Sequence, residues 1–259
     1  VTVTQGKLEG LSLTDLHFGG GDEYVVASTP VLVATQTISL WLNWDTTAND
    51  QVVLSNGNAG DFYGPTQGWT LFQDNADGYQ FKTENGEEDN FSDNGTITTG
   101  KWQHVVVTSA GSLNTLYLDG VAIGTNDNTL VARSHPLYMG WSDASDNLTN
   151  YFDGKMRDVR IYKYEMSADQ VSSLYSGSYN VTPDYWWKLD EGVDGDSDNL
   201  EDSGTASDAD GDAQGFPTDI PASATNGWTN GTLDLDSTLT IGTRLDSPVK
   251  GFLSAPRGT

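Results

Sequence analysis

Short segments in which apolar and polar residues alternate recur along this chain, and turn-forming residues separate them. In residues 38–44 (ISLWLNW), the side chains of Ile38, Leu40, Leu42 and Trp44 share one face of an extended backbone. A period of two predicts β-strands with one buried face, so we expect an all-β fold with few helices. Similar alternation occurs in residues 69–72, 79–81 and 116–118.

Pairs of residues that tolerate a positive φ angle lie between these segments. Such pairs suit the tight turns of β-hairpins. Together with the strand spacing, they predict antiparallel strands arranged as a sandwich or a barrel. The pairs are Asp77-Gly78, Asn85-Gly86, Asn94-Gly95 and Asp119-Gly120.

One short helix is expected near residue 170. Ser167 and Gln170 have the spacing of a capping box, and Val171 and Leu174 follow at helical spacing. Gly177 is suited to the left-handed conformation that often ends a helix.

The composition changes after residue 179. Acidic residues crowd together with Gly and Ser over residues 184–219, although residues 185–189 (YWWKL) are mostly apolar. We therefore expect one domain over residues 1–179. Residues 180–259 are interpreted as an acidic linker followed by a partial second β module.

The charge of the chain excludes nucleic acid as a primary ligand. Its 259 residues include 12 basic and 37 acidic side chains, a net charge of −25. With so few Lys and Arg, no basic stripe is available to neutralise phosphates.

No segment approaches the roughly 20 apolar residues that cross a bilayer, so we expect no membrane insertion. The absence of cysteine excludes disulfides and thiolate chemistry.

Four motifs occur in a characteristic order: residues 101–108 (KWQHVVVT), 116–120 (LYLDG), 151–162 (YFDGKMRDVRIY) and the helix expected at 167–175. In order and spacing they resemble the laminin-G-like, concanavalin A-like lectin/glucanase superfamily, over about residues 7–179. The resemblance implies a jelly roll of two antiparallel sheets. Domains of this kind are usually extracellular, commonly bind glycans or proteins, and often hold calcium.

Two further resemblances concern the C-terminal part. Residues 187–192 (WKLDEG) look like the start of another such module, and residues 251–258 (GFLSAPRG) look like linking stretches in virion structural proteins of marine phages. The chain also begins with Val1 rather than Met. We therefore expect a segment of a larger extracellular or virion protein, located outside the cell or on the virion surface.

The sequence predicts no enzymatic activity. A retaining glycoside hydrolase needs two carboxyl groups about 5 Å apart, which hydrolases of this fold place on one strand. Glu84, Glu87 and Glu88 lie instead in a segment rich in Gly and Asn, typical of a solvated loop. A catalytic triad would need a histidine beside a serine with an orienting carboxylate, and we expect His104 to be a packed structural residue.

A structural calcium ion is expected on the outer face of the sandwich. Val159 and Ile161 share the face that we expect to fill the core, so the Asp158 side chain projects from the opposite, outer face. Calcium takes six to eight oxygen ligands, and the turn at residues 19–23 would contribute backbone carbonyls and Asp22. The alternative is that Asp158 forms an ion pair with Arg157 or Arg160.

A ligand-binding rim is expected in residues 141–150 (WSDASDNLTN). Aromatic faces stack on sugar rings, and neighbouring polar groups hydrogen-bond the hydroxyls. The alternative is that the tryptophan only closes one end of the sandwich. The candidate ligand-binding residues are Trp141, Asp143, Asp146 and Asn147.

These features favour a non-catalytic recognition or adhesion module for a glycan or protein surface, with a glycan as the favoured ligand. One alternative is a structural domain, such as a fibre or capsid decoration, that forms homo-oligomers within a larger assembly. The other is an accessory domain of a carbohydrate-active enzyme.

Overall fold

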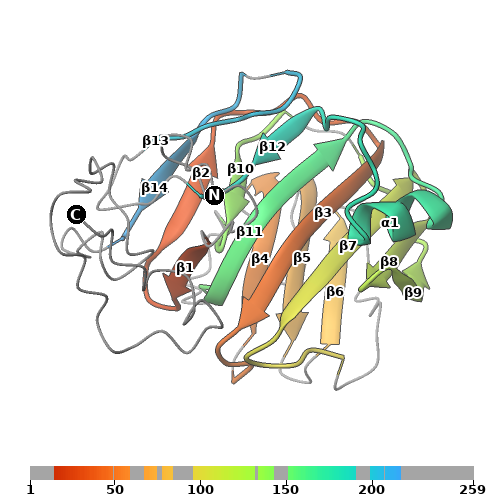
Figure 1. Ribbon diagram of the computed structural model, residues 1–259. Helices are drawn as coiled ribbons and strands as arrows, with labels where there is room; N and C mark the ends of the chain where they lie inside the picture. The colour runs from red at the N-terminus through yellow and green to blue at the C-terminus, as the bar shows by residue number, and fades with distance from the viewer. Residues whose placement is uncertain are drawn as a thin grey trace, which may run out of the picture.

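Two antiparallel sheets pack face to face in the computed structural model, and one helix lies against the outside of the sandwich (Figure 1). This arrangement confirms the all-β class, the two-sheet jelly roll and the short helix. The structure describes residues 15–48, 50–58, 67–74, 78–83, 96–131, 134–142, 151–190, 199–206 and 208–216.

The first sheet, called sheet A, faces the viewer in Figure 1. A further strand, β12 (Tyr185–Trp187), continues the line of β1 along the same edge of β11. The order of the other strands is β1 (Leu16–Gly19), β11 (Asp153–Tyr162), β3 (Thr35–Trp44), β7 (Trp102–Ala110), β8 (Asn114–Leu118) and β9 (Val121–Asn126).

The second sheet, called sheet B, lies behind sheet A. All of its paired strands are antiparallel. Their order is β13 (Asn199–Leu200), β14 (Gly211–Gln214), β2 (Tyr24–Ala27), β10 (Leu137–Met139), β4 (Gln51–Asn58), β5 (Gln67–Asp74) and β6 (Gly78–Thr83).

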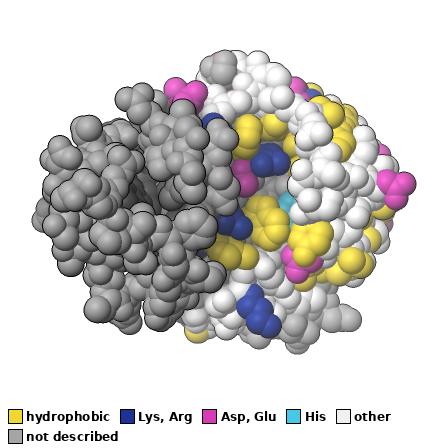
Figure 2. All heavy atoms as spheres, in the orientation of Figure 1, with side chains coloured by type: hydrophobic (Ala, Val, Ile, Leu, Met, Phe, Trp, Pro, Cys, Tyr) yellow, Lys and Arg dark blue, Asp and Glu magenta, His cyan; other side chains and the backbone are white. Residues whose placement is uncertain are grey.

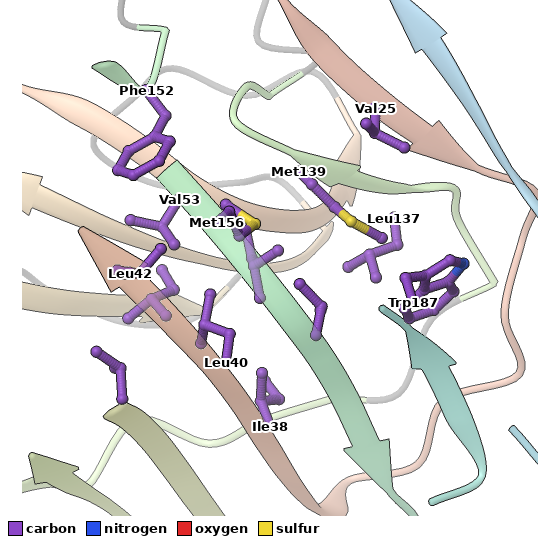
Figure 3. Packing of buried hydrophobic residues seen from close by; sticks show 14 of the residues in the cluster. Val25, Ile38, Leu40, Leu42, Val53, Leu137, Met139, Phe152, Met156 and Trp187 are labelled. Carbon is purple, nitrogen blue, oxygen red and sulfur yellow. The ribbon is translucent and has the colours of Figure 1, made fainter. Parts of the chain in front are cut away.

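The alternation in β3 creates the sheet A side of the core. Ile38, Leu40, Leu42 and Trp44 are at most 1% exposed, as the sequence predicted. Full burial of one such side chain contributes about 1.5–3 kcal/mol. Figure 3 shows Ile38, Leu40 and Leu42 on the side of the core opposite sheet B, whose buried side chains include Val25, Val53, Leu137 and Met139.

The described strands after residue 179 complete both sheets of this sandwich. β12 pairs with β11 of sheet A, and β14 pairs with β2 of sheet B. Trp187, Leu200 and Phe216 belong to the same buried core as the earlier strands. The acidic composition of this region therefore does not mark the edge of the sandwich. The structure does not test whether residues 1–179 fold on their own, and a truncated chain answers that question.

The helix α1 (Ala168–Tyr175) begins and ends as expected. Ser167 and Gln170 form the capping box, and Gly177, at φ +74°, follows the last turn. Val171 and Leu174 pack on the outer face of sheet A. Within the described part of the chain, no helix is long and apolar enough to cross a membrane.

A β-bulge in β11 changes which side chains share a face. The register with β3 shifts between Arg157 and Arg160, and Asp158 has φ +54°. Met156 and Val159 are both fully buried although they are three residues apart. The extra residue of a bulge has this effect, since regular strands alternate with a period of two. Arg157 and Arg160 consequently both point outward from sheet A.

Candidate functional site

Four aromatic side chains gather on the outer face of sheet B: Tyr24, Tyr138, Trp141 and Tyr151, called here the Trp141 cluster. Tyr24 and Tyr138 occupy outward positions of β2 and β10, because their neighbours in each strand are fully buried. All four side chains are only partly buried.

The indole of Trp141 lies at the centre of this cluster. Its ring centroid is 4.8 Å from that of Tyr24, 5.4 Å from that of Tyr138 and 6.0 Å from that of Tyr151. The Trp141 and Tyr151 rings are inclined by only 11°. Aromatic pairs of this kind contribute about 0.5–1.5 kcal/mol beyond their buried area. Trp141 therefore packs against rings on the outside of sheet B rather than against the core.

Asp22 is placed beside the Trp141 cluster. Burial raises the pKa of the Tyr151 hydroxyl, and the nearby Asp22 carboxylate raises it further. The other candidate ligand-binding residues belong to the segment that joins Trp141 to Tyr151. That segment lies outside the described residues, and with it Asp143, Asp146 and Asn147.

The structure does not bring Asp22 and Asp158 together. β1 runs antiparallel to β11 with Gly19 opposite Asp153, so the chain continues to Asp22 in the direction away from Asp158. The five residues from Asp153 to Asp158 alone span roughly 16 Å of strand. One ion cannot be shared across that distance, since calcium–oxygen bonds are about 2.3–2.6 Å long.

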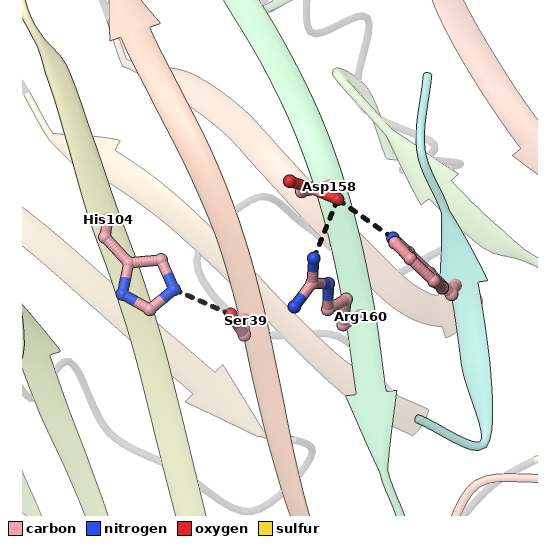
Figure 4. A network of polar contacts seen from close by, with 5 residues as sticks. Ser39, His104, Asp158 and Arg160 are labelled. Atoms are coloured by element: carbon pink, nitrogen blue, oxygen red, sulfur yellow. Dashed lines mark hydrogen bonds and ion pairs between the residues drawn. The ribbon is translucent and has the colours of Figure 1, made fainter. Parts of the chain in front are cut away.

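Asp158 has protein partners instead. Its Oδ1 atom accepts hydrogen bonds from Arg160 Nη2 at 3.0 Å and from Trp186 Nε1 at 2.9 Å (Figure 4). The ion pair with Arg160 is one of the two that the alternative interpretation named. Sequence reasoning missed the contact with Trp186, because this residue follows the domain boundary expected at residue 179.

A group with metal-ligating side chains occurs elsewhere, at one end of sheet A. It consists of His17 on β1, Asp45 immediately after β3 and Asp153 at the start of β11, with ligand atoms within 4.8 Å of one another. Burial raises the pKa of Asp153, and the Asp45 carboxylate raises it further. Sequence reasoning missed this group because its members come from three separate motifs.

This group is able to hold a divalent cation. His17 Nε2 and Asp45 Oδ2 are 2.8 Å apart, and both side chains are about half exposed, at 50% and 45%. One imidazole nitrogen with two carboxylates suits zinc and similar ions, whereas calcium prefers six to eight oxygen ligands.

A serine and a histidine do meet in sheet A, on β3 and β7. Ser39 Oγ and His104 Nε2 are 2.9 Å apart, and each residue is 2% exposed. Burial, with a smaller contribution from the Arg160 charge, lowers the pKa of His104 to about 4. Among the described residues His104 Nδ1 has no hydrogen-bond partner, so none of their carboxylates orients the imidazole. The burial of His104 confirms that it is a packed residue, and this pair lacks the third member of a triad.

Comparison with known families agrees with this architecture. Residues 18–172, more than half of the chain, match the family described as the concanavalin A-like lectin/glucanases superfamily. The chain belongs to this superfamily. No curated protein matches it.

Solved structures with the same fold include a candidate carbohydrate-binding protein from Bacteroides ovatus, with a TM-score of 0.56 at 16% identity. That match covers 77% of this chain and 59% of the Bacteroides chain. This chain therefore spans less than two thirds of the length of the Bacteroides protein. A heptameric SAP-like pentraxin from Limulus polyphemus has a TM-score of 0.49 at 14% identity, covering 62% of this chain and 81% of that one.

A third similar structure is the CBM40 of a Ruminococcus gnavus sialidase, bound to α2,3-sialyllactose. Its TM-score is 0.48 at 13% identity, and the match covers 62% of this chain and 96% of that one. The description of the matching family itself names both lectins and glucanases. At 16% identity, the match to the Bacteroides structure shows a common fold only.

Proposed function

We propose that this chain is a non-catalytic carbohydrate-binding module and that the Trp141 cluster is its sugar-binding surface. The observation that carries the proposal is the partly exposed, nearly parallel pair of Trp141 and Tyr151 on the outside of sheet B. Membership of a lectin superfamily supports the proposal at the level of the fold.

The arrangement of the cluster suits a sugar for two physical reasons. Aromatic faces bind the apolar C–H faces of sugar rings, and polar groups beside them fix the hydroxyls. Asp22 supplies such a group beside Tyr151, and we assign the same role to Asp143, Asp146 and Asn147. The rings of Trp141, Tyr24 and Tyr138 already pack on one another, which reduces the ordering cost of binding.

We place this module in a larger extracellular or virion protein, where it would act in recognition or adhesion. The absence of catalysis is part of the proposal. It is supported by the Ser39–His104 pair, which has no orienting carboxylate on the imidazole. A purely structural domain of an assembly would bind no glycan, which gives the experiment a clear alternative.

The proposed ion is a single divalent cation with a structural role, held by His17, Asp45 and Asp153. Calcium would use the two carboxylates, whereas the imidazole favours zinc. This assignment replaces the pairing of Asp22 with Asp158.

A glycan array probed with the whole chain tests the function. We expect binding to at least one glycan class, weakened at least tenfold by Trp141→Ala. Leu113→Ala is the control, because Leu113 is an exposed apolar residue in the turn between β7 and β8 of sheet A, outside both the Trp141 cluster and the aromatic wall around Trp41. The absence of any glycan binding, or equal losses in both variants, would contradict the proposal.

A further inference from the structure

The outer face of sheet A has a recess of its own, over β3, β7 and β11. Figure 2 shows a hollow there, with hydrophobic and basic side chains around it and a histidine visible inside. We call this the sheet A recess and define it by Trp41, Trp102, Arg157, Arg160 and Tyr175, with His104 at its base.

The strand register explains how these side chains meet. Trp41 on β3 lies opposite Arg157 of β11 on one side and opposite His104 of β7 on the other. Tyr175, at the end of α1, stacks on the Trp41 ring at 5.9 Å and on the His104 ring at 5.8 Å. The rings therefore form one continuous aromatic wall beside Arg157.

Arg157 is held by aromatic rings and by no acidic partner. Its guanidinium carbon lies 4.2 Å from the ring centroid of Trp102 and 5.4 Å from that of Trp41. Across the described residues, it makes no hydrogen bond or ion pair. Such an arginine is unexpected in a chain with 37 acidic side chains. Contacts of a guanidinium with ring faces leave the N–H groups along its edge available.

One further nitrogen at the recess lacks a partner among the described residues, because His104 Nδ1 is buried without a hydrogen bond. Arg160 donates a hydrogen bond from Nη2 to Asp158, and its guanidinium also interacts with the Tyr162 hydroxyl. Buried polar atoms are almost always satisfied, so an unpartnered one calls for an explanation such as a ligand or an ordered water. The charges around the recess favour an anion, because Arg157, Arg160 and Lys188 outnumber the carboxylates of Asp158 and Asp119.

We propose that the sheet A recess binds the carboxylate of a single acidic sugar, with Arg157 as the main carboxylate ligand and Trp41 and Tyr175 as the stacking wall. A guanidinium presents a planar fork that matches both oxygens of a carboxylate. The flanking tryptophan rings hold that fork in place before the ligand arrives. The net charge of −25 repels long polyanions, which favours one terminal acidic residue over an acidic polymer.

This inference rests on the proposed function only in that both ligands are sugars. The two sites lie on opposite faces of the sandwich, since the Trp141 cluster is on the outside of sheet B. An experiment can therefore contradict sugar binding at one site without contradicting it at the other.

The test follows the Arg157 Nε–Hε signal of the whole, ¹⁵N-labelled chain by NMR. The probes are glucuronate, N-acetylneuraminate, glucose, acetate and a short acidic peptide. We expect at least one acidic sugar to shift this signal, no shift with glucose, and at least tenfold weaker binding of acetate and of the peptide. Arg157→Gln should weaken binding of the acidic sugar at least tenfold. Arg157→Lys, which keeps the charge but loses the fork, should also weaken it.

Lys101→Gln is the matched control, because it removes one positive charge from an exposed residue immediately before β7. It should leave binding unchanged, as should Trp141→Ala. Circular dichroism of each variant checks that the fold is intact. The inference is overturned if neither acidic sugar binds, if Arg157→Gln in a folded protein binds as well as the parent, or if acetate or the peptide binds as tightly as the sugar. Loss in Trp141→Ala alone would also overturn it.

Discussion

A hydrogen bond between Trp186 and Asp158 joins β12 to β11, two paired strands of sheet A that α1 separates in the chain. The indole Nε1 of Trp186 donates a 2.9 Å hydrogen bond to Asp158 Oδ1, and the backbone N–H of Asp158 donates to Lys188 O at 3.1 Å. β12 is thereby attached to β11 at its bulge. This contact gives Asp158 a structural role where the sequence predicted a metal ligand.

Asp158→Asn should lower the free energy of unfolding by only about 0–1 kcal/mol, the range for partly exposed ion pairs. The Arg160 and Asp158 side chains are 23% and 31% exposed, and an asparagine oxygen still accepts the Trp186 hydrogen bond. The loss should shrink in high NaCl, because salt screens the pair. Thermal melts with EDTA and with NaCl measure this. If EDTA lowers the melting temperature of the parent chain, and Asp158→Asn abolishes this sensitivity to EDTA, the result would support a metal at Asp158 instead.

Truncation after residue 179 should prevent stable folding, whereas a chain ending at residue 216 should fold. The shorter chain loses β12, β13 and β14, and with them Trp187, which is fully buried. Trp187→Ala alone should cost about 3–5 kcal/mol, the range for large buried aromatics. Circular dichroism and limited proteolysis of both chains decide the question. A protease-resistant 1–179 fragment with a cooperative melt would show that the first domain is independent.

Protonation of His104 should destabilise the fold below neutral pH. Its folded pKa of about 4 lies below the value of 6.5 expected in the unfolded chain, mainly because the imidazole is buried. The unfolded state therefore binds more protons as the pH falls from about 6.5 to 4, and stability is lost over that window. A shift of this size corresponds to about 3 kcal/mol.

His104→Gln serves as the comparison, because it cannot titrate in this range. The stability difference between parent and variant, measured by urea unfolding at several pH values, should narrow between pH 6.5 and 4. A difference that stays constant over this range would show that His104 titrates normally in the folded protein.

Zinc should raise the melting temperature of the chain more than calcium at the same concentration, through His17, Asp45 and Asp153. A cation that binds only the folded state stabilises it by about 2.7 kcal/mol at one hundred times its Kd. His17→Ala should abolish the zinc effect, and Asp22→Asn, an exposed acid outside the group, should not. Equal zinc effects in both variants would exclude this group as the site.

Local sequence patterns predicted the features that depend on neighbouring residues. The alternation in residues 38–44 gave the buried face of β3, and the capping box gave the start of α1. Asp119 and Gly120 adopt the positive φ angles that their turn requires. Each of these follows from the backbone preference or polarity of a few adjacent residues, which is why the sequence is informative there.

The C-terminal strands were harder to interpret, because their pattern is short and interrupted by acidic residues. β12 and β13 have only three and two residues. β13 joins sheet B by pairing with β14, and β14 in turn pairs with β2, which lies more than a hundred residues earlier in the chain. No local signal reports such pairing.

Local patterns in the sequence were therefore enough to predict the fold class, the superfamily and the helix with its caps, since periodicity and capping involve residues close in the chain. Which functional side chains meet depends on tertiary contacts. Strand register places Trp41 between Arg157 and His104, and the bulge at Asp158 turns both Arg157 and Arg160 outward. Such contacts depend on how segments distant in sequence align across a sheet, and one residue of slippage would move every side chain to the other face.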